Sequence, residues 1–340
     1  MKTIFSTLML KKQLQNLSSS SLTSVITASV VALCLSSPLQ AQTYPSKTIT
    51  IVVPTAPGGA NDAMARIIAQ NLSTKLGQPV IVDNKAGANG AIASEFVARA
   101  TPDGYTLMFG YIGTHGINPV LQKLRYDPIK NFEPITMVAT SPTLVVVNPN
   151  VNVNSAKELV ALIKSQPGKF SYASAGKGTA PHLTGELFKL NTGTDMLHVP
   201  YKGSSPAIVD TMAGVTQVMF PSLFTAYPQV KGGKLKALGI AGKKRSSVLP
   251  NVPTLNEQGI MHVEVDQWYA MFAPAGTPKP IITELNKVLV EILKDKSVEK
   301  KIEEQGADVE TTTPEELLAF VKKEGIRWKK VVDDAKITVD

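Results

Sequence analysis

Cysteine is nearly absent from this sequence, whose only one is Cys34. It lies in an N-terminal segment with the parts of a secretory signal: early lysines, an apolar run over residues 25–35, and a small residue at Ala41. We expect a signal peptide over residues 1–41. Lipid modification of the cysteine is disfavoured, because Leu33 before it is bulky where lipoprotein signals have a small residue. The mature chain then has no disulfide, thiol nucleophile or cysteine metal site.

Long apolar runs and strong charge are also missing. No stretch reaches the length of a membrane helix, and charged residues make up 18% of the chain against 43% hydrophobic ones, which is typical of a globular protein. Loss of the signal lowers the formal net charge from +8 to about +5. The basic cluster at residues 243–245 has no interleaved aromatics, so we expect no nucleic acid partner. A weak positive charge still attracts small anions.

Recognisable catalytic and metal motifs are lacking too. The four histidines are scattered, no HExxH or CxxC occurs, and no GxSxG nucleophile motif is present, so we expect no metal and no cofactor. The GKGT stretch at residues 176–179 fails as a phosphate loop because Ser171 stands where the first glycine is needed. A catalytic triad built from distant residues is not excluded by sequence, but nothing favours one.

The stretch from residue 48 to residue 76 is the most informative one present. A β-branched run over residues 48–53 predicts a buried strand, and apolar positions at helical spacing over residues 64–76 predict a helix. Gly58 and Gly59 form the bend between them, with Asn61 or Asp62 as the expected N-cap. A helix start offers unpaired N–H groups to an anion, so this bend is either a binding loop or an ordinary connection.

The pattern of strand and helix then repeats. We expect strands at residues 80–84 and 105–110 with a helix at residues 91–100 between them, which indicates a parallel sheet covered by helices. Ligands of such sheets bind beyond the carboxyl ends of the strands. The loop over residues 111–115 follows the third strand at that end.

A second glycine-rich bend follows in the next half of the chain. After an extended segment at residues 135–148 and a helix at residues 155–165, the strand over residues 170–174 leads into Gly176 and Gly178. A Thr179 cap and Pro181 in the first turn then begin a helix that runs to about residue 191. Two such bends in separate lobes can grip one anion from both sides.

Five polar residues are considered for both a structural and a binding role. Asp62 and Asp210 are favoured as structural, because a carboxylate repels a bound anion and a mid-helix aspartate is usually solvated. For His182 neither interpretation is favoured: its ring either packs against the bend or contacts the ligand. Tyr201 and Lys202 follow a predicted strand end and can donate to carboxylate oxygens.

The rest of the chain supplies further strands, a crossing and the closing helices. The sequence predicts a strand, a turn and a helix over residues 198–214, and short strands at residues 218–222 and 235–241. An extended segment at residues 263–274 returns to the first lobe. Helices are expected at residues 280–293, 298–304 and 314–334.

Five stretches, PTAPGGAND, YASAGKGTAPHL, HVPYKGSSPAIVD, VPTLNEQG and WYAMFAPAGTP, occur in this order behind the signal. In order and spacing the chain closely resembles the solute receptors of tripartite tricarboxylate transporters, the Bug or TctC family. The resemblance implies an α/β periplasmic binding protein of type II-like plan, with two lobes, each a sheet flanked by helices, and two crossover segments. It differs at Thr55, where the family often has an aromatic residue.

The resemblance also implies a division of the chain and a set of ligand residues. Residues 42–142 with 266–340 are expected in the first lobe and residues 143–265 in the second. In the family a carboxylate is held by two loops, here residues 55–62 and 174–179. The expected ligand-binding residues are Thr55, Pro57, Gly58, Gly59, Ala60, Asp62, Gly113, Thr114, Ser174, Ala175, Gly176, Gly178, Thr179, His182, Tyr201 and Asp210. The part of the ligand beyond this carboxylate would contact the side chains of Tyr111, Thr114, Tyr201, Phe220 and Trp268.

The function expected from this resemblance is non-catalytic. A monomeric periplasmic receptor would capture a di- or tricarboxylate or an aromatic acid and deliver it to the permease subunits of a tripartite tricarboxylate transporter. Two alternatives stay open from sequence: an exported hydrolase or lyase acting on an organic acid, and a sensor that presents its ligand to a signalling protein.

Overall fold

The computed structural model describes residues 44–335 and 337. The predicted signal segment, the cleavage after Ala41 and Cys34 lie outside the described residues. Within the part of the chain that is described, no helix is both long enough and apolar enough to cross a lipid bilayer.

Three parallel strands begin the fold: β1 (Ile49–Val53), β2 (Val80–Asn84) and β3 (Thr106–Tyr111). β1 lies between the other two, and its side chains are fully buried except at Thr50, which explains its run of isoleucine and valine. Helices α2 (Ala60–Leu76) and α3 (Ala91–Ala98) connect these strands. The predicted parallel arrangement is therefore confirmed.

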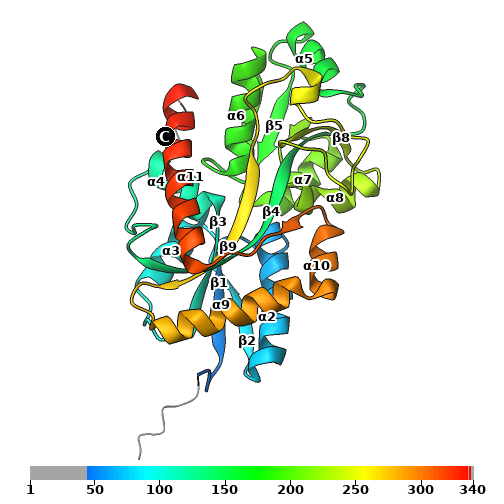
Figure 1. The fold of residues 1–340 in the computed structure, drawn as a ribbon. Coiled ribbons are helices and arrows are strands. Elements are labelled where there is room, and N and C mark those ends of the chain that lie inside the picture. Colours follow the sequence, from blue (N-terminus) through cyan, green and yellow to red (C-terminus); the bar gives the residue numbers. More distant parts are fainter. Residues whose placement is uncertain (1–43, 336, 338–340) are drawn as a thin grey trace, which may run out of the picture. The chain divides into compact units, whose positions relative to one another are not determined.

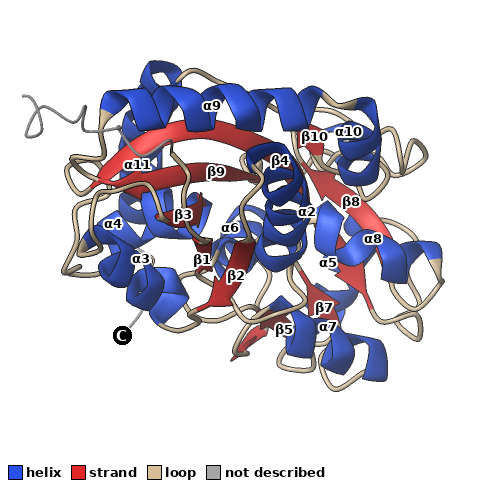
Figure 2. Ribbon diagram, turned by 90° about the horizontal axis from the view of Figure 1, so that it is seen from below, coloured by secondary structure: helices blue, strands red, loops and turns tan. Residues whose placement is uncertain are grey.

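Two long antiparallel strands carry the chain between two halves of the molecule. β4 (Phe132–Val147) pairs with β9 (Asp266–Pro274) as far as Pro142, and from Thr143 onward it pairs with β8 (Lys236–Ala241) and then β7 (Val218–Met219). Figure 2 shows both as long curved strands with α9 beside them. The two predicted crossover segments are thus present, while the division at residue 142 stays a prediction.

The second half contains its own parallel strands. β5 (Ser171–Ser174) lies between β6 (Leu197–Pro200) and β7, and the whole sheet has the order β2-β1-β3-β9-β4-β7-β5-β6, with β8 and β10 on β4. The helices of this half are α5 (Ala156–Ser165), α6 (Ala180–Thr192), α7 (Ser204–Ala213) and α8 (Leu223–Lys231). We call the half with β1–β3 the first lobe and the half with β5–β7 the second lobe (Figure 1).

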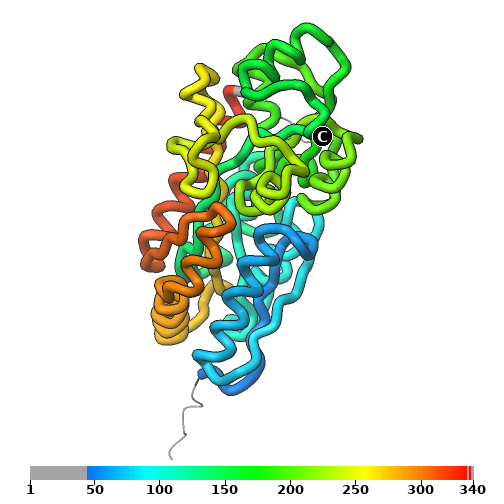
Figure 3. The backbone as a smooth tube through the Cα atoms, turned by 90° about the vertical axis from the view of Figure 1, so that its right-hand side faces the viewer, coloured from blue at the N-terminus to red at the C-terminus, as the bar shows by residue number. Residues whose placement is uncertain are grey.

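The C-terminal elements return to the first lobe, as Figure 3 shows by the orange helices beside the blue N-terminal elements. They are α9 (Lys279–Lys294), α10 (Lys296–Glu303), β10 (Asp308–Val309) and α11 (Pro314–Ala335). Glu324 of α11 is buried and accepts hydrogen bonds from the indole N–H groups of Trp268 at 2.9 Å and Trp328 at 3.0 Å. This carboxylate fastens α11 to β9.

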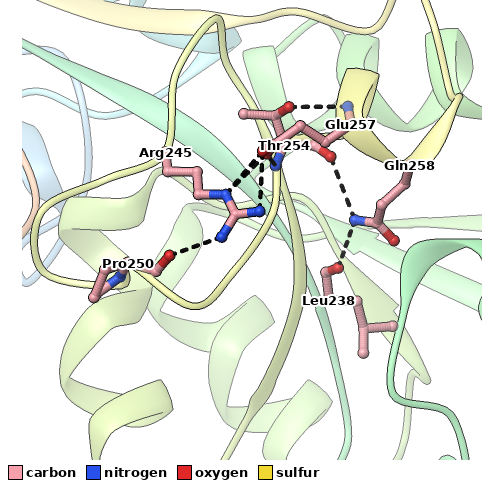
Figure 4. Close-up of polar contacts among 6 residues, drawn as sticks. All are labelled: Leu238, Arg245, Pro250, Thr254, Glu257 and Gln258. Atoms are coloured by element: carbon pink, nitrogen blue, oxygen red, sulfur yellow. Dashed lines mark hydrogen bonds and ion pairs between the residues drawn. The ribbon is translucent and has the colours of Figure 1, made fainter.

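Figure 4 shows the polar network that fixes the VPTLNEQG stretch. Thr254 and Glu257 bond each other's backbone N–H groups, and Glu257 also forms an ion pair with Arg245. Gln258 is buried, where its Oε1 accepts the N–H of Ala156 at 2.8 Å and its Nε2 donates to the carbonyl of Leu238 at 2.9 Å. One side chain in the turn η3 (Asn256–Gln258) thus ties α5 to β8.

Some local predictions were wrong. The N-cap of α2 is Gly59 rather than Asn61 or Asp62, because the helix begins at Ala60. No helix was predicted at α8, where Pro228 lies inside the helix and obscures its pattern. After β3 the chain forms a π-helical turn η2 (Gly113–Ile117) and the short α4 (Asn118–Leu121).

Candidate functional site

The loop after β1 is held by a buried carboxylate. Asp62 accepts hydrogen bonds from the Gly58 N–H at 3.0 Å and from Asn84 Nδ2 at 3.0 Å, and it forms an ion pair with Arg66 at 2.9 Å. Burial by itself would raise the pKa of this carboxyl, but the bonds from Arg66, Gly58 and Asn84 outweigh burial and lower its pKa. Asp62 therefore shapes the loop from behind.

The loop after β5 is held in a similar way by Ser174. Its Oγ accepts the N–H of Gly176 at 3.1 Å and lies 2.6 Å from His198 Nε2. The Gly178 N–H donates to His182 Nδ1 at 3.1 Å, so this ring nitrogen carries no proton. Burial lowers the pKa of His182, and burial followed by the neighbouring His182 lowers the pKa of His198 to about 3. The stacked rings are neutral supports of the loop.

Two further loops reach the same place. The turn after β6 brings Gly203 to the start of α7, where its N–H bonds the carbonyl of Ala175 at 3.1 Å. The loop after β2 carries residues 86–90 beside β3. All four loops follow the carboxyl ends of parallel strands, where open α/β sheets bind ligands.

These loops enclose a cavity of about 570 Å³, a size common for small-molecule sites. The wall carries two lysines, Lys177 and Lys202, and neither aspartate nor glutamate. Its lining is Pro54, Thr55, Ala56, Gly59, Ala60, Asn61, Ala86, Gly87, Ala88, Asn89, Gly90, Tyr111, Ala175, Gly176, Lys177, Thr179, Pro181, Tyr201, Lys202, Gly203, Ser204, Ser205, Ser222, Thr225, Gln267 and Tyr269.

Three helices begin at this cavity. The N-caps of α2, α6 and α7 are Gly59, Thr179 and Gly203, all of which line the wall, and none provides a side-chain cap to its helix. Thr179 uses its hydroxyl to donate to the carbonyl of Gly176 at 2.7 Å instead. The positive ends of three helix dipoles therefore meet around one space.

Several buried polar atoms on the wall have no protein partner. Four such side-chain atoms occur among the described residues, and three of them belong to the cavity: Thr55 Oγ1, Asn61 Oδ1 and the hydroxyl of Tyr269. Leaving a buried polar group unpaired costs about 1–3 kcal/mol, so a site with three of them is suited to a polar guest. Burial also raises the pKa of Tyr269 to about 12, so this phenol stays a donor.

The structure brings some predicted site residues onto the wall and leaves others behind it. Eight predicted residues line the cavity: Thr55, Gly59, Ala60, Ala175, Gly176, Thr179, Tyr201 and, from the second set, Tyr111. The others lie outside its lining: Pro57, Gly58, Asp62, Gly113, Thr114, Ser174, Gly178, His182, Asp210, Phe220 and Trp268. Their roles in ligand binding stay predictions.

Several residues outside the lining have structural partners instead. Thr114 Oγ1 accepts the N–H of Tyr111 at 3.1 Å and also bonds its neighbour His115, which shapes η2. Asp210 accepts the hydroxyl of Tyr201 at 2.7 Å, and burial followed by this carboxylate raises the pKa of Tyr201 to about 12. Phe220 is fully buried in the second lobe.

Sequence reasoning did not assign about half of the wall. The loop over residues 86–90 follows a predicted strand and contains Gly87 and Gly90, so the strand-end rule points to it. Ser204 and Ser205 begin α7, which also follows a predicted strand, so the same strand-end rule points to them. No local pattern in the sequence marks Ser222 and Thr225 at the start of α8, or Gln267 and Tyr269 in β9, as residues of the wall.

This arrangement does not resemble a catalytic or metal centre. Among the described residues no group of three histidine, cysteine or acidic side chains can hold a metal ion. The close pair of Ser174 and His198 lies outside the cavity lining, and Ser174 is fully buried with its Oγ committed to Gly176. A two-lobed cavity with an amide-rich, lysine-bearing wall defines a solute-binding receptor.

Comparison with known proteins gives the same class. The family model described as "Tripartite tricarboxylate transporter family receptor" (TctC) matches residues 64–337, so the chain belongs to this family. It is a family of receptors, which confirms that the chain is not an enzyme and overturns the alternative of an exported hydrolase or lyase.

Solved structures agree in fold. The periplasmic binding protein BugD is 36% identical with a TM-score of 0.83, covering 87% of this chain and 99% of BugD. Rpa4515 of R. palustris with adipate is 34% identical with a TM-score of 0.85, covering 87% and 99%. MatC from Rhodopseudomonas palustris with bound malate is 34% identical with a TM-score of 0.80, covering 85% and 100%. The two-lobed α/β fold of a periplasmic binding protein is therefore confirmed.

Proposed function

We propose that this protein is an exported receptor that captures a small carboxylate in the cavity between its lobes and delivers it to a tripartite tricarboxylate transporter. The observation that carries the proposal is the wall itself: three helix starts, two lysines and no carboxylate surround one space of about 570 Å³. Preorganised N–H groups and ammonium groups give short, strong hydrogen bonds to a carboxylate.

The proposed ligand class is a di- or tricarboxylate or an aromatic acid. Structures similar to this one hold adipate and malate, both dicarboxylates. The unpaired hydroxyl of Tyr269 and the side chains of Ser222, Thr225 and Gln267 offer neutral hydrogen-bonding partners for the part of the guest away from its first carboxylate.

A thermal-shift screen tests the proposal, followed by calorimetry. Acetate, succinate, malate, adipate, citrate and benzoate are compared at equal ionic strength with their uncharged amides. A carboxylate present at a hundred times its Kd should stabilise the fold by about 2.7 kcal/mol, and its amide should not. If no carboxylate raises the melting temperature above its amide, the proposal fails.

The export and delivery steps need a test in cells. Fractionation should find the mature chain in the periplasm, beginning near residue 42, and deletion of the gene should abolish uptake of the acid found in the screen. Crosslinking of the ligand-bound protein should capture a tripartite permease. Capture of a signalling protein in its place would favour the sensor alternative. The monomeric state is a further prediction, to be checked by light scattering.

A further inference from the structure

The wall segment Gly87–Gly90 has an unusual backbone. Its four consecutive residues all have positive φ, at 134° for Gly87, 46° for Ala88, 50° for Asn89 and 87° for Gly90. Left-handed conformations are unfavourable for residues with a Cβ, although asparagine tolerates them better than most. Such a segment persists only where its surroundings hold it in place.

Asn89 supplies the bonds that hold this segment within the first lobe. Its Nδ2 donates to Asn118 Oδ1 at 2.8 Å, while Asn118 Nδ2 donates back to the main-chain carbonyl of Asn89 at 2.9 Å. Its Oδ1 accepts the hydroxyl of Tyr111. Asn118 and Tyr111 are 1% and 6% exposed, so this brace is rigid and out of water. The donors and acceptors fix which way the Asn89 amide points.

The same side chain also reaches the second lobe. Asn89 Nδ2 lies 2.7 Å from the carbonyl oxygen of Gly178, in the bend that begins α6. The lobes also approach each other between the loop after β1 and the start of α7, since a Cβ added at Gly58 would lie 3.1 Å from Ser205 Oγ. The bond from Asn89 therefore joins the two lobes directly beside the cavity.

We infer that Asn89 is a positioning residue that latches the two lobes together over the cavity, so that the protein itself stabilises the closed form and slows the release of ligand. One hydrogen bond between parts of a protein shifts an equilibrium by roughly two- to tenfold. The apparent affinity of a receptor is proportional to the fraction of molecules in the binding-competent form. Loss of the latch should lower that fraction.

The first test measures closure without any ligand, and so does not depend on the proposed function. Spin labels are placed at the exposed Lys157 of α5 and Lys287 of α9 as cysteines, in a Cys34→Ser background, and the distance between lobes is measured by pulsed electron resonance. Asn89→Gly keeps the left-handed backbone and removes the side chain, whereas Asn89→Asp keeps its size but cannot donate to the Gly178 carbonyl.

Both variants should lower the ratio of short to long distances by about three- to tenfold relative to wild type. Asn118→Ala removes the brace without touching the cavity and should shift the ratio in the same direction. Asn71→Ala is the control, because its side chain donates to the carbonyl of Ile67 within its own helix. An unchanged distance distribution in folded Asn89→Gly and Asn89→Asp overturns the inference, as does a wild type that is fully open without ligand.

The second test measures release and rests on the proposed function. With adipate as probe, stopped-flow dissociation from Asn89→Gly should be about three- to tenfold faster than from wild type, with association changed less than about twofold. Equal dissociation rates would overturn the latch. If adipate does not bind the wild type, this test counts against the proposed ligand class and not against the latch. The distances measured without ligand then decide whether Asn89 acts as a latch.

Discussion

At the scale of single residues, the cavity wall is built largely from backbone and small side chains. Gly59, Ala60, Ala175, Gly176 and Gly203 let three helix starts approach the space closely. The carboxylates of Asp62 and Asp210 stand behind the wall with partners of their own, so neither charge faces the guest. This separation keeps the cavity favourable to an anion.

Gly59→Val should abolish carboxylate binding and leave the protein folded. Gly59 has φ of −89°, which any residue adopts, and a Cβ added there meets no atom within 4 Å, so the valine lies in open space at the cavity. We expect affinity to fall at least about a hundredfold, an effect of about 2.7 kcal/mol, while the unfolding free energy changes by less than about 1 kcal/mol. Calorimetry and urea denaturation measure the two quantities.

The matched control is Gly325→Val in α11, where an added Cβ also meets nothing within 4 Å. It lies outside the cavity lining and should leave affinity unchanged. A folded Gly59→Val protein with wild-type affinity would remove the loop after β1 from the site.

Tyr269→Phe should weaken binding without lowering stability. The hydroxyl of Tyr269 makes no hydrogen bond of good geometry within the protein, so its removal should cost the folded state little, whereas a hydrogen bond to the guest is lost. We expect about tenfold weaker binding, close to 1.4 kcal/mol. Tyr126→Phe is the opposite control: its hydroxyl donates to the Thr114 carbonyl at 2.8 Å, so stability should fall and affinity should not. The same effect from both variants would exclude a ligand contact at Tyr269.

At the scale of elements, the site depends on where parallel strands end. The sequence places two glycine bends after β1 and β5, and the structure adds the loops after β2 and β6 by the same geometry. Ser155 caps α5 and accepts the N–H of Glu158 at 3.1 Å. Local patterns of this kind can be recognised in a sequence because they depend on residues close together in the chain.

Gln258→Leu should destabilise the second lobe. In the wild type the Gln258 amide bonds both the Ala156 N–H and the Leu238 carbonyl, and the substitution leaves both groups buried without partners. Figure 4 shows the bond to Leu238. We expect the unfolding free energy to fall by about 2–4 kcal/mol, measured by urea denaturation. Gln305→Leu is the control, since the Gln305 side chain donates to the Lys301 carbonyl at an exposed position. A loss below about 1 kcal/mol would show that this network does not hold the VPTLNEQG stretch.

At the scale of the whole molecule, buried histidines make stability depend on pH. His115 is 1% exposed and stacks on Phe272 at 4.0 Å between ring centres, and burial lowers its pKa to about 3. In the unfolded chain His115 has its ordinary pKa of 6.5, whereas the buried ring of the folded protein binds a proton only near pH 3. Stability from this group is therefore fully present above about pH 7 and falls as the pH drops towards 3.

The measurement is urea denaturation between pH 7 and pH 4. Below its unfolded pKa, His115 should contribute a slope of up to about 1.4 kcal/mol per pH unit, so His115→Leu should show a shallower decline than wild type. The matched control is the substitution His262→Asn at an exposed histidine with positive φ. Equal slopes for wild type and His115→Leu would mean that His115 is not the source.

Much of the architecture followed from sequence alone. The order of strands and helices, the parallel sheets, the two crossings and the glycine bends are local or periodic features, since β-branched runs, helical spacing and glycines act over a few residues. The helix at Leu223–Lys231 was missed because Pro228 interrupts its pattern, and Asn61 and Asp62 were misplaced as caps because helix boundaries are the least certain feature of a sequence.

The tertiary structure alone decided which side chains share the cavity. Tyr269 and Gln267 come from β9, and Asn89 comes from a left-handed loop, but they meet the bend at Gly176 only because β4 and β9 bring the two lobes together. His182 and Ser174, close to the bend in sequence, support it from behind. Sequence determined that two glycine bends exist, because each depends on adjacent residues. The cavity that both bends line depends on contacts between residues far apart in the chain.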